Sequence, residues 1–481
     1  MKKLILLTTL LLPLLIFSQT KLGADIDGEA AGDYSGHSVS YSSDGTIVAI
    51  GAYGNDGNGS FSGHVRVYKN ISGTWTQLGS DINGEAAYDY SGIRGSVSLS
   101  SDGTIVAIGA PFNDGGGDAS GHVRVYDWDG NDWNLLGAEI DGEAADDYSG
   151  YSVSLSSDGT IVAIGAYEND GTATNAGHVR VYQYSGGTWT QLGADIDGEG
   201  SWAKSGYSVS LSSDGTIVAI GAQFDDGGGD ASGHVRVYEY SGSTWTKIGA
   251  DIDGEAAGDQ SGSSVSLSSD GTIVAIGAIL NDGGGSNSGS VRVYKNISGT
   301  WTQLGSDING EAANDYSGSS VSLSSDGTTV AIGAFLNDGG GDASGHVRVY
   351  EYVGSSWIQY IDDIDGEGDG DYFGYSVSLS GDGTKVAIGA PLDPYGPSGN
   401  GYVRVYDIKI SVINSVSLAA DNSTITVTTS LGVYNSSGGS SDLEATDFTL
   451  SISGGSATLT SATPTSISKT SQSIWVLGVG L

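Results

Sequence analysis

The sequence predicts an all-β fold in which one strand-rich unit is repeated seven times. An Asp-Gly turn recurs along the chain, as in Ser98–Ala110 (SLSSDGTIVAIGA). Its aspartates are 58 residues apart once and then 56 residues apart five times. They are Asp44, Asp102, Asp158, Asp214, Asp270, Asp326 and Asp382. Only strand patterns lie between these turns, which is typical of propeller blades. The sequence therefore predicts a seven-bladed β-propeller, followed by a small β-sandwich-like module.

The chain begins with a segment that we expect to be removed on export. Lys2 and Lys3 precede an apolar run at residues 4–17. This pattern is typical of a secretory signal peptide, which we assign to residues 1–18. No later run reaches the roughly 18 apolar residues that a membrane helix needs. The expectation is a secreted or cell-surface protein with no membrane span.

Composition excludes some partners. The 57 acidic residues outnumber the 18 basic ones, for a formal net charge of -39. Such a surface repels nucleic acid and anionic lipid, while it could hold divalent cations. The chain has no cysteine, so its stability must come from a hydrophobic core rather than from disulfides.

One repeat is long enough for four strands. Residues Tyr151–Ser157 alternate apolar and small polar side chains, and Thr160–Ala166 is almost continuously apolar. These patterns predict a first strand with one buried face and a second strand with two. Residues His178–Tyr184 alternate again, and Thr188–Ile196 forms the last and most polar strand.

The ends of the repeat array predict how the ring closes. After Tyr402–Ile408 no fourth strand follows in the seventh unit. Residues Thr20–Glu29 match Thr190–Glu199 at nine of ten positions. We therefore expect the N-terminal segment to supply the fourth strand of the last blade, which removes two open sheet edges. The propeller is assigned to residues 19–408.

The two faces of the propeller differ in their loops. Strands of a blade are antiparallel, so the SDGT hairpin and the short turn before the last strand share one face. The other connections are long, acidic and rich in glycine, as at Asn113–Gly121 and Asp25–Gly36. We call the face that carries them the loop-rich face, and we expect any ligand to bind there.

Residues 372–391 carry both Phe373-Gly374 and Gly389-Ala390-Pro391. This segment resembles the FG-GAP repeat of integrin-α-like propellers, and the resemblance spans about residues 20–408. It implies a seven-bladed propeller of the secreted bacterial surface type that binds protein or glycan partners. Such propellers often hold calcium between the first two strands of a blade. The corresponding loops of this chain carry a single aspartate, so we interpret Asp44 and its six counterparts as turn formers.

The blade-to-blade links offer a second place for calcium. Asp25, Asp27, Glu29 and Asp33 stand at positions 1, 3, 5 and 9, as at the start of an EF-type loop, although Gly36 occupies position 12. The alternative is a set of solvated turns. The candidate calcium ligands are Asp25, Asp27, Glu29, Asp33, Asp251, Asp253, Glu255, Asp259, Asp363, Asp365, Glu367 and Asp371.

Three residue types recur once in most repeats, which indicates structural roles. Arginine recurs in the third strand, where we expect it to pair with a carboxylate of a neighbouring blade. Tryptophan recurs in the fourth strand, where we expect it to pack between blades. The histidine that opens the third strand is expected to be structural. These positions are Arg66, Arg124, Arg180, Arg236, Arg292, Arg348, Arg404, Trp75, Trp133, Trp189, Trp245, Trp301, Trp357, His64, His122, His178, His234 and His346.

A functional site in a repeat protein should break the symmetry. Residues Gly200–Gly206 (GSWAKSG) bring Trp202 and Lys204 into one link. Residues Ser91–Val97 (SGIRGSV) insert two residues and bring Arg94. On the loop-rich face these side chains could hold a sugar or an acidic group, and we take them as candidate ligand-binding residues. The alternative is drift among repeats.

After Ile408 the repeat ends, and residues 411–481 alternate again at Ser423–Ser430, Asp447–Ser453 and Ser456–Ser461. These residues predict a small all-β, sandwich-like domain, which we expect to be incomplete in this sequence. We expect the propeller to be monomeric and to belong to a longer multidomain chain.

The sequence has no nucleophile elbow, zinc-spaced histidine pair or phosphate-binding glycine loop. The favoured hypothesis is a noncatalytic binding or adhesion propeller that recognises a glycan or an extracellular protein, with no certain cofactor beyond possible calcium. The alternatives are a polysaccharide-degrading propeller enzyme and a ligand-free spacer.

Overall fold

A computed structural model describes residues 19–392, 399–408, 413–418, 424–429, 466–471 and 474–478. The chain divides into two compact units. One unit comprises Lys21–Gln359 and Asp363–Tyr406, and the other contains the C-terminal strands. Among the described residues, no helix is long and apolar enough to cross a membrane. The predicted signal peptide lies outside the described residues.

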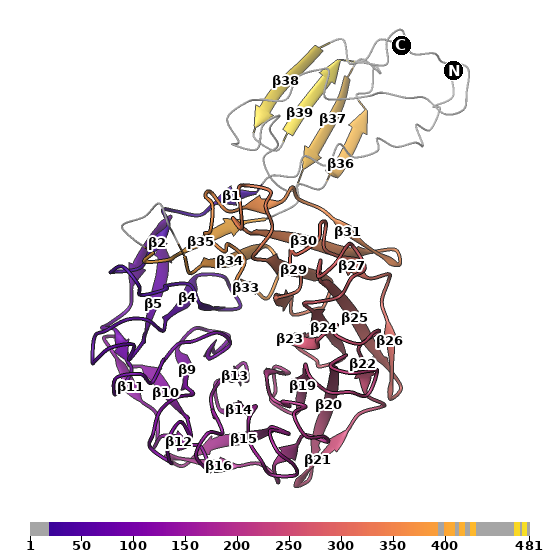
Figure 1. The fold of residues 1–481 in the computed structure, drawn as a ribbon. Coiled ribbons are helices and arrows are strands. Elements are labelled where there is room, and N and C mark those ends of the chain that lie inside the picture. The colour runs from indigo at the N-terminus through magenta and orange to yellow at the C-terminus, as the bar shows by residue number, and fades with distance from the viewer. Residues whose placement is uncertain are drawn as a thin grey trace. The chain divides into compact units, whose positions relative to one another are not determined.

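The first unit is a ring of seven antiparallel sheets, which confirms the predicted seven-bladed propeller (Figure 1). The first strands of the blades are β3 (Ser38–Tyr41), β8 (Val97–Leu99), β13 (Ser152–Leu155), β18 (Ser208–Leu211), β23 (Ser261–Leu267), β28 (Ser320–Leu323) and β33 (Ser376–Leu379). The second strands are β4 (Ile47–Ala52), β9 (Ile105–Ala110), β14 (Ile161–Ala166), β19 (Ile217–Ala222), β24 (Ile273–Ala278), β29 (Thr329–Ala334) and β34 (Lys385–Ala390).

The third and fourth strands complete each blade. The third strands are β5 (His64–Ile71), β10 (His122–Trp128), β15 (His178–Ser185), β20 (His234–Ser241), β25 (Ser290–Ile297), β30 (His346–Val353) and β35 (Tyr402–Asp407). The fourth strands are β6 (Thr74–Gln77), β11 (Trp133–Leu135), β16 (Thr188–Gln191), β21 (Thr244–Lys247), β26 (Thr300–Gln303), β31 (Ser356–Gln359) and β1 (Thr20–Lys21).

A short fifth segment also pairs with each third strand. These segments are β7 (Ile82–Asn83), β12 (Ile140–Asp141), β17 (Ile196–Asp197), β22 (Ile252–Asp253), β27 (Ile308–Asn309), β32 (Ile364–Asp365) and β2 (Ile26–Asp27). The prediction of one continuous fourth strand over Thr188–Ile196 was therefore wrong. The strand breaks at Gly193, which has φ +75°. A Cβ atom there would lie 3.1 Å from the indole of Trp245, so the next blade occupies that space.

The N-terminal segment closes the ring, as predicted. Both β1 and β2 pair with β35, with Ile26 opposite Val403. In Figure 1 the indigo β2 lies beside the orange β35.

Two further rings of hydrogen bonds run around the inner strands. In one, a backbone amide of each SDGT turn donates to the next turn over 2.8 Å, and Gly381 donating to Ser43 completes the circle. In the other, a first-strand amide of each blade donates to a serine hydroxyl in the first strand of the preceding blade. Tyr41 N–H, which donates to Ser378 Oγ over 3.1 Å, completes this second circle.

The hydrophobic core lies between neighbouring blades. One cluster combines Val179, Val181 and Ile196 of the third blade with Leu211 and Ile220 of the fourth. Each fully buried Val or Ile contributes about 1.5–3 kcal/mol to folding. The apolar second strands are therefore covered on both faces, as their sequence predicts.

The recurring arginines join each blade to the preceding one, and the recurring tryptophans do so in six of the seven blades, which confirms their predicted roles. Trp189 Nε1 donates to the carbonyl of Leu136 over 2.7 Å. Arg180 donates to the carbonyl of Asp141 over 2.8 Å, and its Nη1 lies 3.6 Å from Glu143 Oε1. Each link therefore carries a carboxylate next to the arginine of the following blade.

The glycines of the FG and GAP positions explain how closely the blades approach. Gly374 has φ +87° and donates to the carbonyl of Gly389 over 3.0 Å. At the GAP position of the preceding blade, a Cβ atom on Gly333 would lie 2.0 Å from the carbonyl oxygen of Gly374. Only glycine leaves room for this contact between neighbouring backbones.

The described strands of the C-terminal unit form one antiparallel sheet in the order β36-β37-β39-β38. They are β36 (Ile413–Leu418), β37 (Thr424–Thr429), β38 (Ser466–Ser471) and β39 (Ile474–Gly478). The predicted strand at 423–430 corresponds to β37. The predicted strands at 447–453 and 456–461 lie outside the described residues.

Candidate ligand-binding site at the channel mouth

The first strands surround a cavity of about 190 Å³ on the axis of the ring. Its wall consists of the serines and valines of those strands. At its loop-rich end stand the residues that follow the FG-type glycines. In each blade a glycine with positive φ, such as Gly150 at +89°, turns the chain from the link into the first strand. The residues at this position that line the cavity are Tyr151, Tyr207, Ser263, Ser319 and Tyr375.

Arg94 extends into this cavity from the second blade. The two-residue insertion places it between Gly92 and Gly95, which both have positive φ. Its guanidinium donates to the carbonyl of Ser319 in the sixth blade and lies 5.0 Å from the ring centroid of Tyr375 in the seventh. Among the described residues that line the cavity, Arg94 is the only one with a formal charge.

His37 occupies the equivalent position in the first blade. Its ring centroid lies 4.4 Å from that of Tyr53 and 4.5 Å from that of Tyr375. Burial and the nearby charge of Arg94 lower the pKa of His37 to about 3. The imidazole is therefore neutral at pH 7, and Arg94 carries the positive charge at the mouth.

A series of half-buried aromatic side chains runs around the mouth on the loop-rich face. We call it the aromatic arc. Successive ring centroids along it are 4.4–6.0 Å apart, so each ring contacts the next. In order, the arc consists of Tyr316, Phe335, Tyr375, His37, Tyr53, Tyr90, Phe112, Tyr148, Tyr167, Tyr151 and Tyr207. Tyr34 also belongs to it and stacks on Tyr53. In the fifth blade, Ser263 and Gln260 stand at positions that are aromatic elsewhere.

The three predicted ligand-binding residues lie in different parts of this face. Arg94 is inside the cavity, whereas Lys204 lies at the edge of the aromatic arc. Lys204 Nζ is 2.6 Å from Glu168 Oε1 and 5.3 Å from the ring centroid of Tyr167. The side chain of Trp202 is 58 % exposed. The aromatic ring of Tyr167 thus connects Lys204 to the cavity, and Trp202 remains outside the arc.

The family model for the FG-GAP repeat matches residues 17–68, 140–182, 247–294, 309–350 and 363–406. The described residues of these matches lie within the seven-bladed ring and include Gly374 and Gly389 of the FG and GAP positions. The chain is an FG-GAP repeat β-propeller.

Solved structures similar to this FG-GAP propeller include Kuenenia stuttgartiensis hydrazine synthase, at 12 % identity. That match covers 77 % of this chain and 94 % of the other, with a TM-score of 0.47. The Cps50 (Swd1) β-propeller domain of Myceliophteria thermophila is similar at 11 % identity, over 80 % of this chain and 100 % of the other, with a TM-score of 0.48. The search of the curated proteins found no match.

The hairpin aspartates of the FG-GAP propeller are turn formers, as predicted. Asp158 Oδ1 accepts hydrogen bonds from Ser156 Oγ, Thr160 N and Thr160 Oγ1 over 2.8–3.0 Å. Burial raises the pKa of Asp158, but these hydrogen bonds outweigh it and lower the pKa overall. Each aspartate satisfies the donors of its own turn.

The candidate calcium ligands of the first link have separate partners. Asp33 is buried and accepts from Ala30 N and Asn55 Nδ2. Asp25 Oδ1 lies 2.7 Å from Arg404 Nε, whereas Glu29 faces Arg66 and Asp27 lies on β2.

The same division recurs in the other two candidate links. Asp259 accepts from Ala256 N and Asn281 Nδ2, and Asp251 lies 2.8 Å from Lys247 Nζ. Asp371 accepts from Glu367 N and Gly368 N. Glu255 lies 3.8 Å from Arg292 and Glu367 2.9 Å from Arg404. Asp253 and Asp365 lie on β22 and β32, and Asp363 precedes β32. In these links the structure does not bring the four side chains to a common point.

Sequence reasoning missed the aromatic arc. Its members occupy three positions of the repeat: one of the two residues after the GA pair, the residue before the SG or FG pair, and the residue after that pair. The available signal was that these positions are mostly aromatic, as in Tyr53, Tyr167 and Tyr207, but vary between blades. The ring places the equivalent positions of the seven blades around one axis, so aromatic residues that are scattered in the sequence form one surface.

Proposed function

We propose that this FG-GAP propeller is a noncatalytic, secreted or cell-surface binding module that recognises a glycan at the mouth of its central cavity. An FG-GAP propeller fits a binding or adhesion role in general. The observation that carries the more specific proposal is the aromatic arc, with Arg94 at its centre.

The aromatic arc has the properties of a sugar-binding surface. Its rings are half-buried, so each is held by its neighbours and still presents part of its surface to solvent. Tyrosine combines an apolar ring, against which the C–H face of a pyranose packs, with a hydroxyl that forms hydrogen bonds. A concave apolar site with a few polar groups is typical of small-ligand recognition.

Arg94 favours a glycan that carries an anionic group. A guanidinium has five N–H donors in a planar arrangement that matches a carboxylate or sulfate. Hydrogen bonds between charged partners are about twice as strong as neutral ones. The described cavity lining contributes no acidic side chain, so Arg94 would be the only charged group that an anionic sugar meets there. A uronic acid or a sulfated sugar is the favoured ligand class.

The same lining supports a noncatalytic role. A glycoside hydrolase places two carboxyl groups about 5–9.5 Å apart across the bond that it cleaves. None of the described residues that line the cavity is an aspartate or a glutamate.

An array of neutral, uronic-acid and sulfated oligosaccharides, probed with the full chain, tests the proposal. We expect binding to anionic oligosaccharides, and at least a tenfold loss of affinity for Arg94→Ala. Lys69→Ala is the matched control, since it removes an exposed positive charge from the end of β5. Binding only to extracellular proteins, or an Arg94→Ala variant that binds as well as the wild type, would contradict the proposal.

A further inference from the structure

Four interfaces between blades carry a cluster of one histidine and two carboxylates, distinct from the mouth. We call them the interblade clusters. In each, the three candidate ligand atoms lie within 4.8 Å of one another. The clusters are Glu29–His64–Asp81, Glu85–His122–Glu139, Glu143–His178–Asp195 and Glu311–His346–Asp363.

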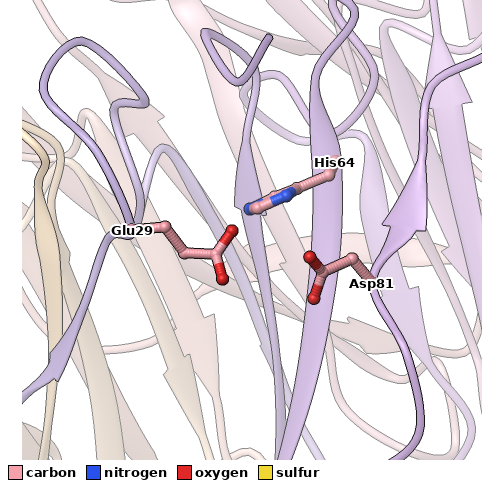
Figure 2. A group of neighbouring side chains, drawn as sticks. All are labelled: Glu29, His64 and Asp81. Atoms are coloured by element: carbon pink, nitrogen blue, oxygen red, sulfur yellow. The ribbon is translucent and has the colours of Figure 1, made fainter. Parts of the chain in front are cut away.

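The three members of a cluster come from fixed positions in the fold. The histidine is the first residue of a third strand, as His64 is of β5. One acid, here Asp81, immediately precedes the short segment that pairs with that strand. The other, here Glu29, lies in the link from the preceding blade. Figure 2 shows the imidazole of His64 and both carboxylates facing a common space.

The distances between the histidine nitrogen and the carboxylate oxygens fit ligands around a metal ion better than direct hydrogen bonds. His122 Nδ1 lies 3.9 Å from Glu85 Oε2 and 3.8 Å from Glu139 Oε2. These separations are too long for hydrogen bonds. Ligand atoms about 2.1 Å from a tetrahedral zinc ion are about 3.4 Å apart. The two His122 pairs would therefore have to close by about 0.4–0.5 Å, and the widest pairs of the four clusters by up to about 1.4 Å. Arg124 lies on the other oxygen of Glu85, at 3.6 Å, which leaves Oε2 for the cluster.

The histidines are buried and have unsatisfied nitrogens. The side chains of His64, His122 and His346 are at most 1 % exposed, and neither ring nitrogen of the three forms a hydrogen bond. A buried polar atom without a partner is costly. An imidazole nitrogen that forms no hydrogen bond is free to bind a metal ion.

From this geometry we propose that each interblade cluster binds one divalent transition-metal ion of the Zn²⁺ class, through one imidazole nitrogen and two carboxylate oxygens. An imidazole ligand favours Zn²⁺ over Ca²⁺, which prefers oxygen alone. Because one carboxylate comes from the preceding blade, the ion would join two blades. Glu29 and Asp363, which the sequence suggested as calcium ligands, here serve a different metal.

The other three interfaces provide natural controls, because each lacks the arrangement. Ser290 and Tyr402 replace the histidine in the fifth and seventh blades. In the fourth blade, His234 Nδ1 instead lies 3.0 Å from Asp225 Oδ1, and Lys247 lies on Asp251. The chain therefore already accepts serine at the histidine position.

The test measures zinc bound to the full chain. Chelator-treated protein is loaded with Zn²⁺ and dialysed against millimolar Ca²⁺ and Mg²⁺, which occupy dispersed surface acids, and bound zinc is counted by mass spectrometry. We expect four zinc ions per chain in the wild type, three in His64→Ser and four in the control His234→Ser. A variant with serine at His64, His122, His178 and His346 should bind none.

Two further measurements keep the proposal falsifiable if a serine variant does not fold. Glu85→Gln changes a side chain that is 40 % exposed and should also remove one zinc ion. Crystals of the zinc-loaded wild type should give anomalous peaks at the four clusters. The proposal is overturned if the wild type retains no zinc, or if the quadruple serine variant retains as much zinc as the wild type.

Discussion

Replacing Ile26 with alanine measures how firmly the N-terminal segment closes the ring. Ile26 lies on β2 opposite Val403 and is 5 % exposed. It packs in one cluster with Val405 of its own blade and with Val39 and Ile50 of the first blade. The residue therefore belongs to the interface between the last and the first blade.

The expected cost follows from this burial. Truncation of a buried isoleucine to alanine removes its transfer free energy and leaves a cavity, at a cost of about 2–5 kcal/mol. Ile252→Ala is the matched control, because Ile252 has the same position in an interior blade and the same 5 % exposure. We expect each substitution to lower the free energy of unfolding by about 3 kcal/mol, and the two values to agree within about 1 kcal/mol.

Urea unfolding of both variants, followed by tryptophan fluorescence, is the assay. Equal shifts of the midpoint at an unchanged slope would show that the closing segment is packed as tightly as an interior one. A stable Ile26→Ala variant beside a destabilised Ile252→Ala variant would refute the closure, since the N-terminal segment would then contribute no core.

Three further predictions concern the blade contacts and the mouth. Gly333→Ala should destabilise the protein by about 3 kcal/mol in urea unfolding, because the new Cβ would lie 2.0 Å from the carbonyl oxygen of Gly374. Gly200→Ala is the control and should leave the stability unchanged, because no atom lies within 4 Å of a Cβ at that position. Equal effects of the two substitutions would contradict the close contact between Gly333 and Gly374. Trp189→Phe should cost about 1 kcal/mol through the lost hydrogen bond to Leu136, whereas the exposed Trp202→Phe should leave the midpoint unchanged. The pKa of His37 falls from 6.5 to about 3 on folding, so its contribution to stability is complete above pH 6.5 and is lost as the pH falls toward 3. Unfolding at a series of pH values should therefore show a shallower loss for His37→Gln than for the wild type, and parallel curves would argue against a buried neutral imidazole.

The architecture could be predicted from the sequence because it is periodic. Alternation in Tyr151–Ser157, the apolar run at Thr160–Ala166 and the Asp-Gly turns each determine a local element, and their repetition gives the number of blades. The match of Thr20–Glu29 to an interior segment predicted the closure. The break at Gly193 was missed, because it depends on an indole from the next blade.

The binding site was less predictable, because it depends on convergence between blades. Arg94 was identified as an insertion, but its position in the cavity beside Tyr375 required the ring geometry. In three of the four interblade clusters the glutamate and the histidine are 35 residues apart, as in Glu29 and His64, and in the fourth Glu85 and His122 are 37 apart. A recurring Glu-to-His spacing was the available signal, and one histidine per repeat was interpreted as structural instead.

The most direct test of the proposed function is the affinity of an array-selected anionic oligosaccharide, measured by calorimetry for two tyrosine variants. Tyr148 belongs to the aromatic arc, 4.9 Å from Phe112, whereas Tyr184 packs on Trp189 away from the mouth. Glycan binding at the mouth predicts at least tenfold weaker binding for Tyr148→Ala and unchanged binding for Tyr184→Ala. Wild-type affinity in Tyr148→Ala, or an equal loss in both variants, would contradict it.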